Sequence, residues 1–321
     1  MKLAVSLTLA GLVALAAAAT LWRAAAREAA IEAAHPPSGR VLDVDGTPVH
    51  VHVSGAGPDL ILLHGAGGSL RDFTFSLAPR LADRYRVIAM DRPGHGYTGT
   101  ISAQTRRDGA SPRQQAILLQ GAARQLGVER AIVLGQSFGG SIAMAWALED
   151  PAMTAAIVTV AGATMPWPGG LGAAYHLNAG RVTGAVTVPL ATAWTNQAYI
   201  TGVFDRIFAP APVPDGYVDH FAPMLSVRRG VLRHNARQVT GLFPHVTAMS
   251  GQYPTITAPV ELIHGTADTI VPAHIHSRPL SHLLPDARLT LLEGAGHMPH
   301  HEAEDAVVAA IDRAAARAGL R

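Results

Sequence analysis

Apolar and polar positions divide the chain into stretches with three different patterns. Leu3–Trp22 holds twenty residues without a charge. In residues 40–163 and again in residues 256–321, short apolar runs alternate with amphipathic ones. Between them, residues 164–255 contain no clear buried strand. We therefore expect one folded core in two sequence segments, separated by an insertion and preceded by a hydrophobic N-terminal segment.

The two alternating segments predict strands followed by helices. Arg40–Gly46 and Thr47–Gly55 alternate around an Asp-Gly turn, which favours a hairpin at a sheet edge. The later runs are continuously apolar, as parallel strands buried on both faces are: "DLILLHG", "RVIAMD", "AIVLGQ", "AAIVTVAG", "PVELIHG" and "RLTLLEG". Helical stretches separate them, for example Ser69–Leu81, Pro112–Leu126, Phe138–Glu149 and Glu302–Arg317. This order predicts an α/β fold with right-handed crossovers.

The insertion, residues 164–255, is too long for a simple loop. A connection of this length in a compact domain usually carries structure of its own, and we expect a helical subdomain. Its Trp and Phe residues, from Trp167 to Phe243, are expected to form the core of that subdomain and to line a pocket.

Residues 1–23 are predicted to be a transmembrane anchor or a signal peptide. A helix over Leu3–Trp22 would be roughly 30 Å long, enough to cross a bilayer. The run is longer than a usual signal-peptide core, and Trp22 and Arg23 are typical of an interfacial stop, so an anchor is favoured. Residues 24–39 are predicted to be a helical stalk and linker. We expect the folded domain outside the cytoplasm, either tethered or secreted after cleavage.

Composition and charge exclude several classes of function. Apolar residues make up 49% and charged residues 15% of the chain, as in a globular protein. The net charge of +2 comes from scattered residues, so no nucleic-acid partner is expected. Without cysteine there is no disulfide, thiolate metal site or Cys nucleophile. The sixteen histidines form no HExxH motif, and we expect neither a metal nor a cofactor. Nothing in the sequence indicates the oligomeric state.

A single serine lies between glycines where an apolar run meets a helical one. Gly135-Gln136-Ser137-Phe138-Gly139 matches G-x-S-x-G at a predicted strand-to-helix turn. Such glycines allow strand and helix to pass closely, while the serine is held in a strained turn with its oxygen exposed. Ser137 is therefore the candidate nucleophile.

A nucleophilic serine needs a base, and the base needs an orienting acid. In open α/β sheets such residues follow the carboxyl ends of later strands. Asp268 follows "VELIHGTA" and His297 follows "RLTLLEGAG", in the chain order Ser, Asp, His expected for this motif. His300 and His301 lie close by, but His297 comes directly after "GAG". The pair His274 and His276 is expected at the surface.

Backbone N–H groups are expected to stabilise the oxyanion. Phe138 begins the predicted helix, where amides lack intrahelical acceptors. The glycine-rich loop "HGAGGS" should supply the second donor, Ala66 first and Gly67 next. In the same loop His64 and Gly65 are expected to support its conformation. Asp91, together with Arg92, is expected to fix a neighbouring loop near the pocket.

Four blocks make the sequence resemble α/β-hydrolase-fold proteins of the esterase and cofactor-free haloperoxidase-like group. They are "LLHGAGGS", "AMDRPGHGYT", "LGQSFGGSIA" and "IHGTADTIVP" with "LLEGAGHMPH". The resemblance covers about residues 40–320 and is weakest in the insertion. It implies a mostly parallel eight-stranded sheet covered by helices on both faces, with a helical lid. It also implies Ser137 as nucleophile, His297 as base and Asp268 as orienting acid.

These observations predict a serine hydrolase that cleaves a carboxylic ester or related acyl compound, with a moderately hydrophobic small-molecule substrate. Perhydrolysis, as in haloperoxidase-like relatives, is an alternative on the same residues. Cleavage of C–C bonds is a second alternative, although "GAGGS" replaces the "GPGA" usual in such hydrolases. Hydrolases of this fold with an aspartate nucleophile are excluded by Ser137. A non-catalytic binding protein would be expected to lack a triad residue.

Overall fold

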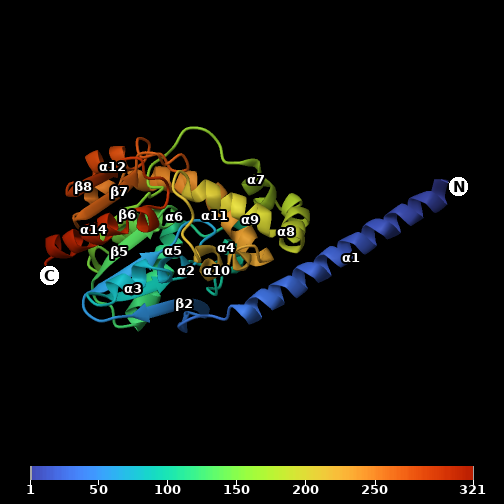
Figure 1. The fold of residues 1–321 in the computed structure, drawn as a ribbon, viewed down its shortest axis with the longest axis horizontal. Coiled ribbons are helices and arrows are strands. Elements are labelled where there is room, and N and C mark those ends of the chain that lie inside the picture. The colour runs from blue at the N-terminus through green and yellow to red at the C-terminus, as the bar shows by residue number, and fades with distance from the viewer. Residues whose placement is uncertain (1, 321) are drawn as a thin grey trace.

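The computed structural model describes residues 2–320, and its centre is one eight-stranded sheet (Figure 1). The strand order is β1-β2-β4-β3-β5-β6-β7-β8. The strands are β1 (Arg40–Val44), β2 (Thr47–Ser54), β3 (Asp59–Leu63), β4 (Arg86–Met90), β5 (Ala131–Gln136), β6 (Thr154–Val160), β7 (Val260–Gly265) and β8 (Ala287–Leu292). β2 runs antiparallel to β1 and to β4, and the other pairs are parallel. The eight strands fall where the hydrophobic pattern predicts them.

The edge hairpin β1–β2 depends on its two-residue turn. Asp45 and Gly46 both have positive φ, 50° and 80°, which is the conformation that Asp-Gly favours in hairpins. The Gly46 N–H also donates to Asp43 Oδ1 at 2.6 Å.

Helices cover both faces of the sheet. On one face lie α2 (Arg71–Thr74), α3 (Leu77–Leu81) and α14 (Glu304–Arg317), and on the other lie α5 (Pro112–Gln125), α6 (Phe138–Glu149) and α12 (Ser277–Leu283). Each layer buries its own apolar cluster against the sheet, for example around Phe73 and Trp146. The predicted α/β-hydrolase fold is therefore confirmed. The helices predicted at Ser69 and Glu302 are each interrupted, because Ser76 and Ala303 leave the helical conformation; α13 (Pro299–Glu302) precedes the second break.

The insertion between β6 and β7 folds into helices that we call the cap (Figure 1). The cap consists of α7 (Ala173–Ala179), α8 (Thr183–Trp194), α9 (Gln197–Phe208), α10 (Tyr217–Phe221), the 3-10 turn η1 (Pro223–Leu225), α11 (Arg229–Ser250) and a second 3-10 turn, η2 (Tyr253–Thr255). α11 also contacts α4 (Ala103–Asp108) of the core.

Residues predicted as anchor and stalk form one uninterrupted helix, α1 (Lys2–Ala34). Its N-terminal half projects away from the body in Figure 1, whereas its C-terminal half packs on α8 and η1 of the cap. In the described part of the chain α1 is the one helix long and apolar enough to cross a membrane, a property that signal sequences share. The segment predicted as a linker is thus docked on the cap up to Ala34.

Candidate active site

Ser137 occupies a strained turn between β5 and α6. Its φ is 51° and its ψ is −117°, a region that costs an L-residue free energy and persists only where the surroundings impose it. The surroundings here are close backbone contacts. A Cβ on Gly135 would lie 2.1 Å from the Gly139 carbonyl, and one on Gly139 would lie 2.1 Å from the Leu63 carbonyl. The glycines of the motif therefore allow the sharp turn that presents Ser137 at the top of the sheet.

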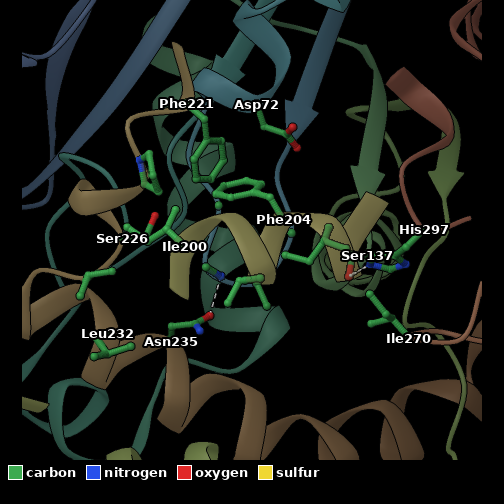
Figure 2. Close-up of a pocket in the computed structure, with 18 of the residues that line it drawn as sticks. Asp72, Ser137, Ile200, Phe204, Phe221, Ser226, Leu232, Asn235, Ile270 and His297 are labelled. Carbon is green, nitrogen blue, oxygen red and sulfur yellow. Dashed lines mark hydrogen bonds between the residues drawn. The ribbon is translucent and has the colours of Figure 1, made fainter. Parts of the chain in front are cut away.

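Ser137, His297 and Asp268 come together in one chain of hydrogen bonds, although they lie up to 160 residues apart. Ser137 Oγ is 3.0 Å from His297 Nε2. Figure 2 marks this hydrogen bond with a dashed line. His297 Nδ1 is 2.8 Å from Asp268 Oδ2. Because the carboxylate can only accept, Nδ1 carries the proton and Nε2 is left to accept the serine hydroxyl proton. This arrangement can activate a serine oxygen.

Asp268 is buried but well supplied with donors. Its Oδ1 accepts from the backbone N–H groups of Ile270 at 2.8 Å and Val271 at 2.9 Å. Burial alone would raise the pKa of Asp268, but hydrogen bonds from His264 and His297 outweigh it and hold the pKa well below its usual range. The carboxylate is thus ionised at neutral pH and keeps the His297 ring in one orientation.

His264 is a member of this cluster that sequence reasoning missed. It lies in β7, with Nε2 3.1 Å from Asp268 Oδ2. His264 is fully buried. Asp268 Oδ2 therefore lies between two imidazoles, those of His264 and His297. The motif "LIHG" places His264 four residues before Asp268, and this spacing was the available signal.

The predicted oxyanion donors differ in what their amides do. Phe138 is the first residue of α6, so its N–H has no intrahelical acceptor. Ala66 lies in the loop after β3 and lines the same cavity as Ser137. The N–H of Gly67, in contrast, donates to Asn235 Oδ1 of the cap at 2.7 Å. This contact argues against Gly67 as a donor, since its proton is already used by a residue 168 positions away.

The expected loop supports form a buried network beneath the site. His64 Nδ1 donates to the Gly65 carbonyl at 2.9 Å, and Nε2 accepts from the Arg92 N–H at 3.0 Å. Burial lowers the pKa of His64 to about 4, so the ring is neutral and can bridge in this way. Asp91 Oδ1 accepts from the Leu70 N–H at 2.7 Å, which holds the far end of the same loop.

Arg92 links this network to the nucleophile turn. Its guanidinium donates to the Gly65 carbonyl at 2.9 Å and lies 4.4 Å from the centre of the Phe138 ring. Burial lowers the pKa of Arg92 to about 9, so it remains charged at neutral pH. A charged guanidinium stacked on Phe138 and bound to Gly65 fixes the two loops that carry the expected oxyanion donors.

A cavity of about 370 Å³ lies between the core and the cap and reaches Ser137 (Figure 2). Apolar side chains of the cap form most of its wall; they include Ile200, Val203, Phe204, Ile207, Phe221 and Leu232. Most aromatic residues of the insertion line the pocket or pack within the cap, as expected. Trp194 is a correction to this expectation, because it is 55% exposed and its ring lies against Arg23 of α1. The lining contains no lysine or arginine, and its one carboxylate is Asp72. Among the described residues, the wall of this cavity is thus largely apolar and presents no cationic side chain of lysine or arginine.

A second aspartate–histidine cluster borders the pocket through Asp72, and sequence reasoning missed it. Asp72 of α2 accepts from the Tyr217 hydroxyl of the cap at 2.6 Å. His301 Nε2 is 2.9 Å from Asp72 Oδ1, and His300 Nε2 is 3.1 Å from Oδ2. Burial would raise the pKa of Asp72, but the charge of and hydrogen bonds from the two histidines hold it well below its usual range. Of these residues, only His300 and His301 stood out in the sequence, because they lie close to His297.

Asp72, His300 and His301 are also the one described group of three side chains placed closely enough to hold a metal ion, with ligand atoms within 4.8 Å of one another. A metal-bound histidine normally donates its other ring N–H to a fixed acceptor. Here Nδ1 of both histidines is buried without a hydrogen-bond partner. The contacts therefore fit a hydrogen-bonded cluster better than a metal site.

His276 differs from the sequence expectation. It was expected at the surface with His274, but it is 3% exposed, and its Nδ1 is 3.2 Å from the Met165 N–H. Burial lowers the pKa of His276 to about 4, so it accepts this bond as a neutral ring. His276 thus joins the loop after β6 to the start of α12. The two bonded residues are 111 positions apart, so local sequence spacing could not predict this contact.

Comparisons with known proteins place this geometry among hydrolases. Residues 60–310 match the model of the "Alpha/beta hydrolase family". The chain is 32% identical over 252 residues to the magnesium-chelatase 30 kDa subunit of Rhodobacter capsulatus, covering 78% of this chain and 84% of that one.

Two further similar proteins differ from each other in activity. A 2-hydroxy-6-oxononadienedioate/2-hydroxy-6-oxononatrienedioate hydrolase of a Pseudomonas species is 24% identical over 286 residues, 82% of this chain and 89% of its own. The crystal structure of a membrane phospholipase A, described as a bacterial virulence factor, superposes with a TM-score of 0.66 and 22% identity over 98% of this chain and 99% of that one. At this identity the structural likeness shows the fold, and it extends over almost the whole chain.

Proposed function

This chain belongs to the alpha/beta hydrolase family, and on that premise we propose that it is a serine hydrolase cleaving a carboxylic ester or a related acyl compound. The observation that carries the proposal is the hydrogen-bonded chain from Ser137 Oγ through His297 to Asp268, with distances of 3.0 and 2.8 Å. Hydrolase activity agrees with the family's relatives, which include an enzyme called a phospholipase and one that cleaves dioate substrates.

In the proposed reaction Ser137 Oγ attacks the carbonyl carbon while its proton passes to His297 Nε2. The N–H groups of Phe138 and Ala66 stabilise the oxyanion that forms. His297 then gives its proton to the leaving alcohol, and an acyl-enzyme remains on Ser137. Water, deprotonated by His297, attacks this ester, and the acid is released as His297 returns the proton to Ser137 Oγ. Asp268 keeps the imidazole in the tautomer that each step requires.

Cleavage of a C–C bond next to a carbonyl is the second candidate, because of the similarity to the dienedioate hydrolase. A dioate carries two carboxylates. The pocket lining offers them no lysine or arginine and presents the carboxylate of Asp72 instead. Charge complementarity therefore favours an uncharged acyl ester over a dioate substrate.

The test is ester turnover by the full chain purified in detergent, with labelling by a fluorophosphonate probe. We expect hydrolysis of a nitrophenyl ester and covalent labelling of Ser137. Ser137→Ala should lower kcat by about 10⁵-fold or more and abolish labelling. Ser226→Ala, which also changes a serine in the pocket lining, is the matched control and should retain activity. Wild-type protein that neither turns over esters nor is labelled would rule out the proposal.

We further propose that α1 is a retained membrane anchor and that the catalytic domain lies outside the cytoplasm. The apolar run ends at Trp22 and Arg23, and the helix continues without a break onto the cap. Cell fractionation with a C-terminal tag should place full-size protein in the membrane. A shorter, soluble form in the periplasm would instead indicate a cleaved signal peptide.

A further inference from the structure

Exposed large apolar side chains of the described residues gather in two places, the N-terminal half of α1 and one side of the cap. We call the second place the cap face; it consists of Leu177, Val182, Val186, Leu190, Trp194 and Tyr199. Soluble surfaces rarely keep such residues together, and a contiguous apolar patch usually marks a binding surface.

The cap face follows helical spacing. Val186, Leu190 and Trp194 are four residues apart along α8, and Val182 directly precedes the helix at the same spacing, which places the four in one stripe. They are 80%, 58%, 45% and 55% exposed. α8 contains no charged residue, and Arg181 is the only Asp, Glu, Lys or Arg between Gly162 and Phe204. An exposed apolar stripe with so little charge nearby favours burial against an apolar partner such as the acyl region of a bilayer.

Contacts between α1 and α8 place the cap face beside the part of α1 that follows its apolar run. Arg23 Nε and Arg27 Nη1 donate to the carbonyl of Ala193 at 2.9 and 2.7 Å, at the C-terminal end of α8. The Arg23 guanidinium also lies 4.6 Å from the centre of the Trp194 ring. These contacts begin where the apolar run of α1 ends. If α1 spans a bilayer, Trp194 then lies at its surface together with Trp22, where tryptophan is enriched.

Ion pairs further along α1 keep this relation rigid. Glu28 receives hydrogen bonds from the guanidinium of Arg229, the closest at 2.6 Å, and Glu32 receives one from Arg228 at 2.6 Å. Both arginines lie at the start of α11. The cap is thus joined to α1 at two successive levels, and it cannot turn away from the membrane without breaking these contacts.

The two helices that flank α8 in the sequence contribute to the pocket wall. Tyr175 of α7 and Ile200 and Phe204 of α9 line the cavity. Tyr199 both lines the cavity and is 61% exposed, which marks the mouth of the pocket. Thr195, another lining residue, accepts a hydrogen bond from Arg27 at its carbonyl, at 2.9 Å. The mouth therefore lies beside α1, at the level where its apolar run ends.

We propose that the cap face lies in the interface of the lipid bilayer that α1 spans, and that apolar acyl chains enter the pocket from this lipid surface past Tyr199. The docking itself requires only the fold. The delivery of a lipid-borne ester through this mouth rests on the proposed function and narrows its substrate class to bilayer-dissolved acyl esters.

Because the chain contains no cysteine, single labels can test the docking directly. Cysteine is introduced at Val186 or Leu190, and at Ile117 of α5 as a matched control, since Ile117 is 53% exposed but belongs to the core. The full chain is spin-labelled and reconstituted in vesicles of phosphatidylcholine and phosphatidylglycerol. Labels on the cap face should collide readily with oxygen and poorly with an aqueous nickel complex, and the control label should do the reverse.

Two outcomes would overturn the docking. Labels at Val186 and Leu190 that respond like the label at Ile117 would place the cap face in water. Spin–spin broadening, with both collision reagents excluded, would show a second copy of this chain covering the cap face instead of lipid.

The delivery step is tested with the double variant Val186→Asp/Leu190→Asp and the control Ile117→Asp. The double variant should lower turnover of a long-chain ester dissolved in the vesicles by about tenfold. The two carboxylates weaken the contact of the cap face with lipid and so move the mouth of the pocket away from the bilayer. Turnover of soluble nitrophenyl acetate should be unchanged in both variants. Unchanged turnover of the vesicle-borne ester would overturn delivery. A wild-type chain inactive on nitrophenyl acetate would instead refute the proposed function, while the spin labels still decide the docking.

Discussion

Two buried aspartate–histidine clusters reach one pocket, one through His297 and the other through Asp72, yet only one of them contacts a nucleophile. Asp268 and His297 lead to Ser137, which is held in a strained turn by close backbone contacts of the core. Asp72 and the pair His300 and His301 lead to Tyr217, a hydroxyl carried by the cap. Both carboxylates are at least nine-tenths buried, and both have a lowered pKa.

The difference lies in what the imidazoles do with their second nitrogen. His297 offers Nε2 to a hydroxyl that borders the cavity, so a proton can move during a reaction. His300 and His301 direct Nε2 to Asp72 and leave Nδ1 buried without a partner. The comparison shows that an aspartate–histidine pair can transfer a proton in a reaction only when the imidazole also contacts a hydroxyl group. We infer that the Asp268 cluster is catalytic and that the Asp72 cluster holds the cap against the core.

The strongest test of this comparison is Asp268→Asn. The amide can donate to His297 and so favour the wrong tautomer, which leaves Nε2 unable to accept the serine proton. We expect kcat for a nitrophenyl ester to fall by about 10³- to 10⁴-fold. Asp72→Asn, measured beside it, serves as the control from the second cluster. Equal losses of kcat in the two variants would contradict the division of roles.

Asp72→Asn should mainly affect stability. The substitution removes the carboxylate charge that His300, His301 and Tyr217 contact. It also places a buried amide N–H donor opposite groups that are themselves donors. We expect the free energy of unfolding to fall by about 1–3 kcal/mol, while kcat stays within about threefold of wild type. Urea denaturation of the full chain in detergent measures the first quantity and steady-state kinetics the second. Asp219→Asn, at an exposed position of α10, is the control and should change neither.

Acid should affect the two clusters alike. Each carboxylate has a folded-state pKa below its ordinary value of 3.8, so the unfolded chain binds protons first as the pH falls. The stabilisation is therefore complete above about pH 4 and is lost as the pH falls through the folded pKa. The deficit in unfolding free energy of Asp72→Asn should therefore stay level from about pH 7 to about pH 4 and shrink below about pH 4, as urea midpoints would show. A deficit that does not vary with pH would mean that the Asp72 charge does not stabilise the fold.

The smallest effect is expected for Tyr217→Phe, which removes the hydroxyl but keeps the ring in the aromatic contacts of the cap. We expect a loss of about 0.5–1.5 kcal/mol in unfolding free energy, the usual net contribution of one hydrogen bond. Tyr199→Phe, at the exposed mouth, is the matched control. A loss no larger than in this control would show that the cap is not held through Asp72.

The cluster of Ser137, His297 and Asp268 was largely predictable because its determinants are local. The glycines around Ser137 are required by backbone atoms a few residues away or on the adjacent strand, so they leave a motif. Asp268 and His297 follow strand ends, and strands that run parallel in one sheet bring those ends to one edge. Their roles remain a proposal, but the strand pattern alone indicates that these residues meet at one edge of the sheet.

The Asp72 cluster and the use of the Gly67 amide were not predictable in this way. Tyr217 is 145 residues from Asp72, and His300 is 228 residues from it. Asn235, which binds the Gly67 N–H, is 168 residues away. In each contact with the cap, the partner comes from a segment without strand periodicity. A lone hydroxyl or amide on such a helix gives no sign of what it will face.

Pattern and motif alone were thus sufficient for the eight strands, the position of Ser137 and the apolar run of α1, because hydrogen-bonding periodicity and Cβ contacts act over a few residues. Tertiary structure decided how the cap sits: which carboxylate meets Tyr217, which amide is consumed by Asn235, and where α1 docks beside the mouth of the pocket. The cap packs mainly through apolar contacts, which are non-directional. Many positions of the cap on the core satisfy the same hydrophobic pattern. The directional contacts of the folded chain select one of them.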